Sequence, residues 1–232
     1  MIVLSVDTTG RAGSAAIVDG TVVLAEVSGD PTLTHGQRLP GELMELVNRA
    51  GVGLNAVDLL AVAAGPGSFT GLRVGIAAMQ GLAMALGKPI VPISTLEALA
   101  RAGARGDDAL VAPWIDAQRG EVFGAVYDSD GQAAIGEPTA LSPTVTLAAL
   151  GRVAAGQPFR FIGDGALRYA DTITAALGPR AQIDPVVPNL ATWIGRIAME
   201  SPDRAVAPHA VAPIYVRRPD AEIARDRRTR QV

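Results

Sequence analysis

Residues 65–75 read GPGSFTGLRVG, and they join a short apolar run to the most apolar long helix that the sequence predicts. The run before them, residues 59–64, is typical of a strand buried on both faces of a sheet. Glycine and proline then interrupt it, because proline fixes φ and lacks an N–H while glycine accepts positive φ. Since a serine and a threonine can cap the next turn, the stretch predicts a sharp turn followed by a helix over residues 70–86.

This predicted helix carries only Arg73 and Gln80 as strongly polar side chains. A helix on the surface of a monomer should show a polar face, so we expect this one to be covered by its own sheet and by a second partner. Small residues recur at every fourth position and form a ridge suited to close helix packing: Ala77, Gly81 and Ala85. A central core helix explains the same spacing nearly as well. A membrane span fits less well, because the run is short for about 20 apolar residues and is broken by glycines.

Composition limits the classes of protein that fit. The chain has 232 residues, 49% of them hydrophobic and 4% aromatic, which suits one large or two small α/β domains. Its net charge of −3 has the wrong sign for a dedicated nucleic-acid binder. The absence of cysteine from the sequence excludes disulfides and thiolate metal sites. The first residues lack the features of a signal peptide, so we expect a cytoplasmic protein.

Three strands open the chain, at residues 2–6, 13–18 and 21–27, and Asp19-Gly20 predicts a tight hairpin between the last two. The turn after the first strand holds Asp7, Thr8 and Thr9. This arrangement resembles the phosphate-binding hairpin of the actin, sugar kinase and Hsp70 superfamily. Ordinary Asx and threonine turn chemistry explains the same residues.

An amphipathic helix is predicted over residues 40–50, with an apolar stripe that includes Leu39, Leu43, Leu46 and Val47. His35 stands just ahead of it. A lone histidine near a helix start is more often a hydrogen-bonded structural residue than a catalytic one, and we interpret His35 in that way.

The polar stretch at residues 101–108 is the best candidate domain boundary. We therefore expect a first lobe at residues 1–104 and a second at 105–216, which repeats the opening pattern of strand, acidic turn and strand. A second glycine-rich turn follows at Gly163-Asp164-Gly165. The tail, residues 217–232, holds six arginines against three acidic residues, and we interpret it as a solvated terminus or, in a complex, a contact to RNA.

Together these segments resemble the TsaB (YeaZ) family of accessory proteins in bacterial tRNA threonylcarbamoyladenosine synthesis. The resemblance covers nearly the whole chain, and residues 65–75 are its most specific part. Four further segments carry it: Val6 to Thr9, His35 with Arg38 to Pro40, Asp116-Ala117 with Arg119 to Val122, and Pro213 to Arg217.

The resemblance implies a two-lobed ASKHA fold, the α/β architecture of actin, Hsp70 and sugar kinases. It implies a non-catalytic subunit that forms a homodimer when alone and pairs with the catalytic subunit TsaD through helices of the first lobe. Threonylcarbamoyl transfer to adenosine 37 of tRNAs that read ANN codons would need both chains and the P-loop ATPase TsaE. It also implies that tRNA is reached only through the complex, that the isolated chain holds no cofactor, and that ATP or ADP binds only in the assembly.

These implications assign roles to particular residues. The partner interface would use two helices of the first lobe: Leu39, Leu43, Leu46, Val47, Leu72, Arg73, Ile76, Ala77, Gln80, Gly81, Leu82 and Met84. The two glycine-rich turns would be vestigial nucleotide or phosphate loops: Asp7, Thr8, Thr9, Gly163, Asp164 and Gly165. No residue is assigned as catalytic or as a metal ligand.

The catalytic relatives hold a metal with a His-x-Glu-Gly-His segment, and Thr95 and Leu99 stand here where the two histidines would be. Neither side chain can replace an imidazole ligand. Two other functions stay open at this point. One is an ASKHA-type ATPase or kinase that uses its turns to cradle phosphates; the other, less favoured, is a metallopeptidase.

Overall fold

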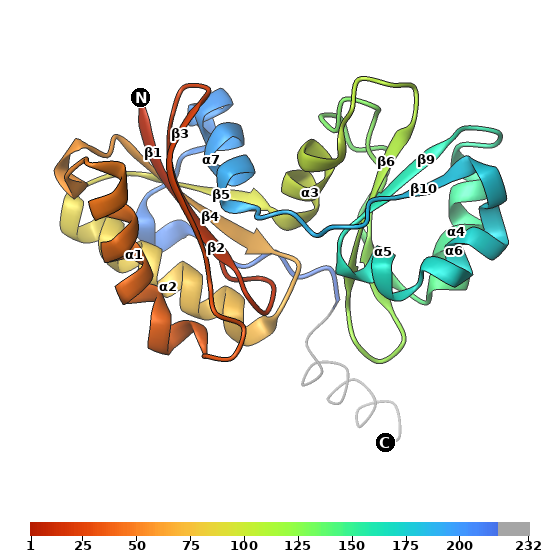
Figure 1. Ribbon diagram of the computed structural model, residues 1–232, viewed down its shortest axis with the longest axis horizontal. Coiled ribbons are helices and arrows are strands. Elements are labelled where there is room, and N and C mark those ends of the chain that lie inside the picture. Colours follow the sequence, from red (N-terminus) through yellow and green to blue (C-terminus); the bar gives the residue numbers. More distant parts are fainter. Residues whose placement is uncertain (218–232) are drawn as a thin grey trace, which may run out of the picture.

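The computed structural model describes residues 1–217 and shows two lobes side by side, each built on a five-stranded mixed sheet (Figure 1). The predicted two-lobed α/β fold is confirmed. Apart from Arg217, the arginine-rich tail lies outside the described residues.

The first lobe has the strand order β3-β2-β1-β4-β5. Its strands are β1 (Ile2–Asp7), β2 (Ser14–Asp19), β3 (Val22–Ser28), β4 (Leu59–Gly65) and β5 (Ile90–Ser94). The first three pair antiparallel, and β4 and β5 run parallel to β1. The hairpin predicted at Asp19-Gly20 is present, with Gly20 at φ 58°. This sheet therefore combines an antiparallel meander, β1 to β3, with a parallel part formed by β1, β4 and β5.

Helices cover both faces of this sheet, and they are α1 (His35–Ala50), α2 (Phe69–Leu86) and α7 (Ala191–Glu200). Helix α3 (Thr95–Gly103) lies between the lobes and contacts β4 and β5 on one side and β6 and β9 on the other. Strand β1 divides its side chains between the two faces, as its period of two requires. Leu4 and Val6 pack with Met79 of α2, whereas Val3 packs with Ile194 of α7. Helices α1 and α2 therefore share one face, opposite α7.

The second lobe has the strand order β10-β9-β6-β7-β8. Its elements are β6 (Leu110–Asp116), β7 (Val122–Gly124), β8 (Thr139–Leu141), α4 (Pro143–Val153), β9 (Phe159–Ile162), α5 (Asp164–Arg168), α6 (Ala170–Leu177) and β10 (Ala181–Ile183). Trp114 and Phe161 meet edge to face in its core, with ring centroids 5.2 Å apart. Strands β8 and β10, three residues each, carry no sequence signal that predicted them.

Two predicted boundaries were wrong. Helix α1 begins at His35 instead of Pro40, because Thr34 and Gln37 form a capping box in which the Thr34 N–H donates to Gln37 Oε1 over 3.0 Å. The lobe boundary also differs, because α7 lies in the stretch assigned to the second lobe and packs on β1, β2 and β4 of the first.

Polar contacts fix α7 on the first sheet. Ser5 Oγ donates to the Ala191 carbonyl over 2.6 Å, and the Ala191 N–H donates to Ser14 Oγ over 3.0 Å. A side chain at Gly195 would lie 2.8 Å from Val18, so only glycine allows this approach. The chain thus returns to its first lobe after building the second.

Helix α2 is the one described helix that is long and apolar enough to cross a membrane by length and composition alone. Its inner face is buried on the sheet through Leu72, Ile76, Met79 and Ala83. A helix that packs on the sheet of a globular lobe passes the same test of composition, and α2 packs in this way along its inner face.

We predict that a fragment of residues 1–104 does not fold alone. It would lack α7 and expose the apolar face of β1, β2 and β4 to water, so we expect aggregation or a molten state in circular dichroism and light scattering.

The matched control is the same fragment joined by a flexible linker to residues 189–217, which restores α7 and should recover a cooperative thermal transition. A cooperatively folded, monomeric 1–104 fragment would contradict the assignment of α7 to the first lobe.

Candidate functional site

The turn between β1 and β2 holds the predicted phosphate-loop residues Asp7, Thr8 and Thr9, all of them buried. Asp7 Oδ1 accepts hydrogen bonds from the Thr9 N–H over 2.8 Å and from Thr9 Oγ1 over 2.6 Å. Burial raises the pKa of the Asp7 carboxyl, and the two hydrogen bonds from Thr9 offset only part of that effect. The Asp7 side chain therefore accepts its hydrogen bonds from within its own turn.

The N-terminus of α2 packs directly on this turn. Thr8 Oγ1 donates to the Gly71 carbonyl over 2.8 Å, and the Ser68 N–H donates to the Thr9 carbonyl over 2.9 Å. A side chain at Gly71 or Gly75 would overlap Thr8, so only glycine lets the helix come this close.

A side chain at Gly67 would likewise lie 2.6 Å from Thr9 Cβ. Three of the glycines in residues 65–75 thus serve the contact between helix and turn. In the isolated chain the Thr8 and Thr9 hydroxyls donate to the Gly71 carbonyl and to Asp7, and the Ser68 N–H donates to the Thr9 carbonyl, so these three donors are not available to a phosphate group.

The second glycine-rich turn, Gly163 to Gly165, packs on the end of β6. Gly163 has φ 110°, and a side chain at Gly165 would lie 2.8 Å from the Ile115 carbonyl carbon. Asp164 Oδ1 accepts from the Asp116 N–H over 3.0 Å. The carboxylate of Asp164 thus orders the adjacent β6–β7 connection, and the role of these residues as vestigial phosphate loops stays a prediction.

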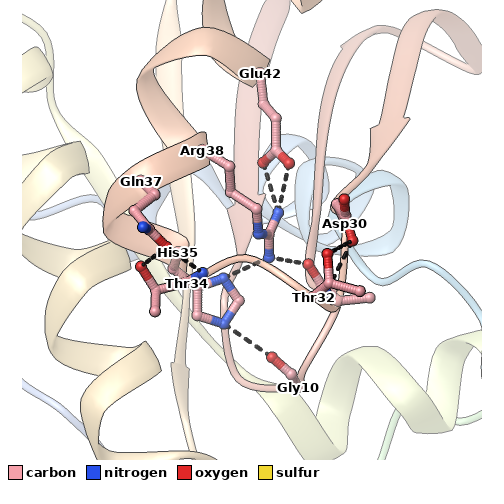
Figure 2. Close-up of polar contacts among 9 residues, drawn as sticks. Gly10, Asp30, Thr32, Thr34, His35, Gln37, Arg38 and Glu42 are labelled. Carbon is pink, nitrogen blue, oxygen red and sulfur yellow. Dashed lines mark hydrogen bonds and ion pairs between the residues drawn. The ribbon is translucent and has the colours of Figure 1, made fainter.

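A cluster of polar contacts around the buried Arg38 side chain attaches α1 to the β1–β2 turn (Figure 2). The Arg38 guanidinium donates to both carboxylate oxygens of Glu42 over 2.6 and 2.7 Å and to the Ala12 carbonyl. It also donates to His35 Nδ1 over 2.6 Å, and His35 Nε2 lies 3.0 Å from the Gly10 carbonyl. Because Arg38 can only donate, His35 is neutral with its proton on Nε2.

The surroundings of His35 favour this neutral form. Burial and the adjacent Arg38 guanidinium lower the pKa of the imidazole, while the Gly10 carbonyl and the Asp7 and Glu42 carboxylates act in the opposite direction and are outweighed. The interpretation of His35 as a structural, hydrogen-bonded residue therefore agrees with its contacts.

Residues 95–99, which the resemblance places at the metal-binding segment of the catalytic relatives, are engaged in contacts within this chain. Thr95 and Leu99 are buried, and Arg204 binds both carboxylate oxygens of Glu97 over 2.7 and 3.0 Å. Burial, with the Glu97 carboxylate, raises the pKa of nearby Tyr127 to about 12. Within residues 1–217 no group of three His, Cys, Asp or Glu side chains is placed to hold a metal ion.

The twelve predicted interface residues fall into three groups. Four are exposed: Arg73, Ala77, Gly81 and Met84. Four are half-buried: Leu43, Val47, Gln80 and Leu82. Four are buried: Leu39, Leu46, Leu72 and Ile76.

The assignment of the last four to the interface was wrong, because their side chains pack against the lobe's own core. An amphipathic stripe does not say by itself whether a sheet or a partner covers it. Gln80 also has an internal role, since Nε2 donates to the Pro208 carbonyl over 2.8 Å and to the Val211 carbonyl at 3.3 Å.

The predicted residue Met84 is the most exposed of this surface, at 71%. Sequence reasoning missed three further exposed residues, Met44, Phe69 and Tyr215, of which the first two are 58% and 49% exposed. Tyr215 lies beside Phe69, with ring centroids 5.9 Å apart. The sequence signal for Phe69 was its place within residues 65–75, whereas nothing local in the sequence brings Tyr215 to α2. We call Phe69, Arg73, Ala77, Gly81 and Met84 the outer face of α2.

Comparisons with known proteins agree on one family. The family model described as "TsaD: tRNA N6-adenosine threonylcarbamoyltransferase" matches residues 32–225. The chain is 37% identical over 131 residues to the tRNA threonylcarbamoyladenosine biosynthesis protein TsaB of Escherichia coli, a match that covers 56% of each. It is 33% identical over 231 residues to an uncharacterized protein of Mycobacterium leprae, covering 95% of this chain and 56% of that one.

Solved structures give the same result. YeaZ from Pseudomonas aeruginosa superposes with a TM-score of 0.75 at 29% identity, over 92% of this chain and 99% of that one. The chain spans about half the length of the first curated relatives that it matches.

We predict opposite effects of alanine at two glycines of α2. Gly71→Ala should destabilise the protein by more than about 2 kcal/mol, because the methyl group overlaps the Thr8 carbonyl. Gly81→Ala is the matched control and should stabilise by up to about 1 kcal/mol, since nothing lies within 4 Å and alanine favours the helix. Urea unfolding measures both, and equal effects would contradict the packing of α2 on the turn.

We also predict a pH effect from His35. Its folded pKa lies below the ordinary value of about 6.5, so the unfolded chain takes up the proton first and stability falls as the pH drops below that value. His35→Gln removes this titration. Urea unfolding between pH 7.5 and 5.5 should show a shallower loss of stability in the variant; a loss identical to that of the natural chain would show that His35 does not titrate differently on folding.

Proposed function

Because this chain belongs to the TsaB (YeaZ) family, with a role in tRNA threonylcarbamoyladenosine biosynthesis, we propose that it is the non-catalytic subunit that completes the threonylcarbamoyltransferase. Its partner would be the catalytic TsaD chain, bound on the outer face of α2, with the ATPase TsaE joining the assembly. The substrate would be adenosine 37 of tRNAs that read ANN codons, reached in the cytoplasm and only through the complex.

The observation that carries this proposal is the uncovered outer face of α2. The inner face of the helix is buried, yet Phe69 and Met84 are largely exposed and a side chain at Gly81 would meet open space. Monomeric proteins rarely leave an apolar helix face uncovered, and such faces mark interaction sites.

The ridge of Ala77, Gly81 and Ala85 suits a helix as the covering element. All three residues are exposed, and small side chains let two helix backbones approach closely. A partner with the same fold would present a helix at the equivalent place. A second copy of this chain would compete for the same surface, so we propose a homodimer when the catalytic subunit is absent.

Three features support a non-catalytic role. The Asp7 carboxylate and the Thr8 hydroxyl are engaged within the chain, and Glu97 is held by Arg204 where a metal ligand set would be needed. We propose that the isolated chain binds no cofactor and that ATP or ADP enters only in the assembled complex. Sustained ATP turnover by the purified chain, absent from a Thr8→Ala variant, would favour a kinase-like enzyme instead.

We predict that Gly81→Arg and Ala77→Arg leave the fold intact and weaken binding of the catalytic subunit ~100-fold or more. A guanidinium in a close helix contact is either buried without a partner or forces the helices apart. Calorimetric titration measures the affinity, and reconstituted tRNA modification should fall in parallel.

The matched control is Ala148→Arg, at an exposed position of α4 in the second lobe, which should bind as the natural chain does. If Gly81→Arg is folded by circular dichroism and still pairs normally, the outer face of α2 is not the interface.

A further inference from the structure

The chain crosses the first lobe once more after α7, as a segment that we call the C-terminal strap, residues 205–217. Val206 pairs with Ile90 at the edge of β5 through two backbone hydrogen bonds of 2.9 and 3.2 Å. Val211 is buried in the core, and the two carbonyls that Gln80 binds belong to this segment. The strap thus lies along α2 before it leaves the lobe.

The strap next meets the end of β4. The Ile214 N–H donates to the Ala64 carbonyl over 2.7 Å. Gly65, at φ 115°, faces the strap, and a side chain there would lie 2.7 Å from the Ile214 carbonyl oxygen. Residues 65–75 therefore accommodate the strap at their first residue as well as the β1–β2 turn at the later ones.

Tyr215 adds a side chain to the outer face of α2. The centroid of its ring lies 5.9 Å from that of Phe69. The Arg73 guanidinium lies over the Phe69 ring, 3.9 Å from its centroid. Both rings are exposed, Phe69 by 49% and Tyr215 by 43%. Among the residues that the structure describes, Arg73 has an aromatic neighbour but no carboxylate partner.

Arg217 then fixes the end of the strap on the second lobe. Its guanidinium donates to the Ala117 carbonyl over 3.1 Å, forms an ion pair with Glu121 and lies 5.5 Å over the ring of Phe123. These three residues belong to the turn after β6 and to β7. One side chain therefore ties the strap, two residues beyond Tyr215, to the opposite lobe.

We propose that Arg217 is a positioning residue for partner binding: by anchoring the strap on the second lobe it holds Tyr215 against Phe69, so that the strap forms part of the partner surface. This inference rests on the proposed function, in which the outer face of α2 binds the catalytic subunit. The partner that fits presents an apolar side chain to the two rings and a carboxylate to Arg73.

The coupling has a definite consequence for binding energies. In this proposal Arg217 affects the affinity for the partner only by holding Tyr215 in place. The losses of binding free energy caused by removing the two side chains must therefore not add. Met84 lies fifteen residues from Phe69, about 22 Å along the helix at 1.5 Å per residue, and offers an independent site on the same surface.

The test is a double-mutant cycle on affinity for the purified catalytic subunit of the same organism. We expect Tyr215→Ala and Arg217→Ala each to weaken binding about tenfold, about 1.4 kcal/mol, and the double variant to bind no more weakly than the weaker single variant. Arg217→Ala combined with Met84→Ala should instead show additive losses. Full additivity with Tyr215→Ala, or unchanged binding by Arg217→Ala, would overturn the proposal.

Two further variants separate positioning from general stability and from the tail. A charge swap, Arg217→Glu with Glu121→Arg, should recover most of the affinity lost by Arg217→Glu alone. A chain ending at Arg217 should bind as the full chain does; a tenfold loss would assign the effect to residues 218–232 instead.

Failure of the inference and of the proposed function are distinguishable. If the natural chain does not bind the catalytic subunit at all, the proposed function fails. If it binds but the cycle is additive, only the role of Arg217 fails. Should Arg217→Ala lower the melting temperature sharply, the cycle is run with Glu121→Gln, which keeps the bond from Arg217 to the Ala117 carbonyl, and the same non-additivity is required.

Discussion

The structure depends on the contact between the β1–β2 turn and the first two turns of α2. Thr8 donates to the Gly71 carbonyl, and glycine at positions 67, 71 and 75 lets backbone lie against backbone there. A methyl group at position 71 would push the helix off the turn. This close contact sets the distance between α2 and the sheet. At that distance the next three inward-facing side chains, Leu72, Ile76 and Met79, are buried.

The same contact decides between two possible roles of the glycine-rich stretch, phosphate binding and helix packing. A glycine-rich turn after a strand suggests phosphate binding, yet here the helix N-terminus takes up the hydrogen-bonding groups that a phosphate would need. The N-terminus of α2 is thus occupied on its inner side, and the surface of the helix that stays available for binding is its outer face. The exposed ridge through Gly81 and the large side chain of Met84 are the features that support a partner subunit.

Most of the fold could be predicted from the sequence, because hydrophobic periods and turn residues act locally. The hairpin at Asp19-Gly20, the buried strand at residues 59–64 and the long helix after it are examples. The predictions failed where distant segments decide the outcome. The attachment of α7 to the first lobe depends on Ser5 and Ser14, and the place of Tyr215 beside Phe69 depends on the whole course of the chain. Leu39 and Leu46 were misplaced because a stripe of leucines looks the same under a sheet as under a partner.

The most direct measurement of the central claim is hydrogen exchange of the natural chain with and without the catalytic subunit. The account predicts slower exchange in peptides that cover α1, α2 and residues 211–217 when the partner is bound, and unchanged exchange in α4 and α6 of the second lobe. Protection confined to α4 and α6, with α2 unaffected, would contradict it.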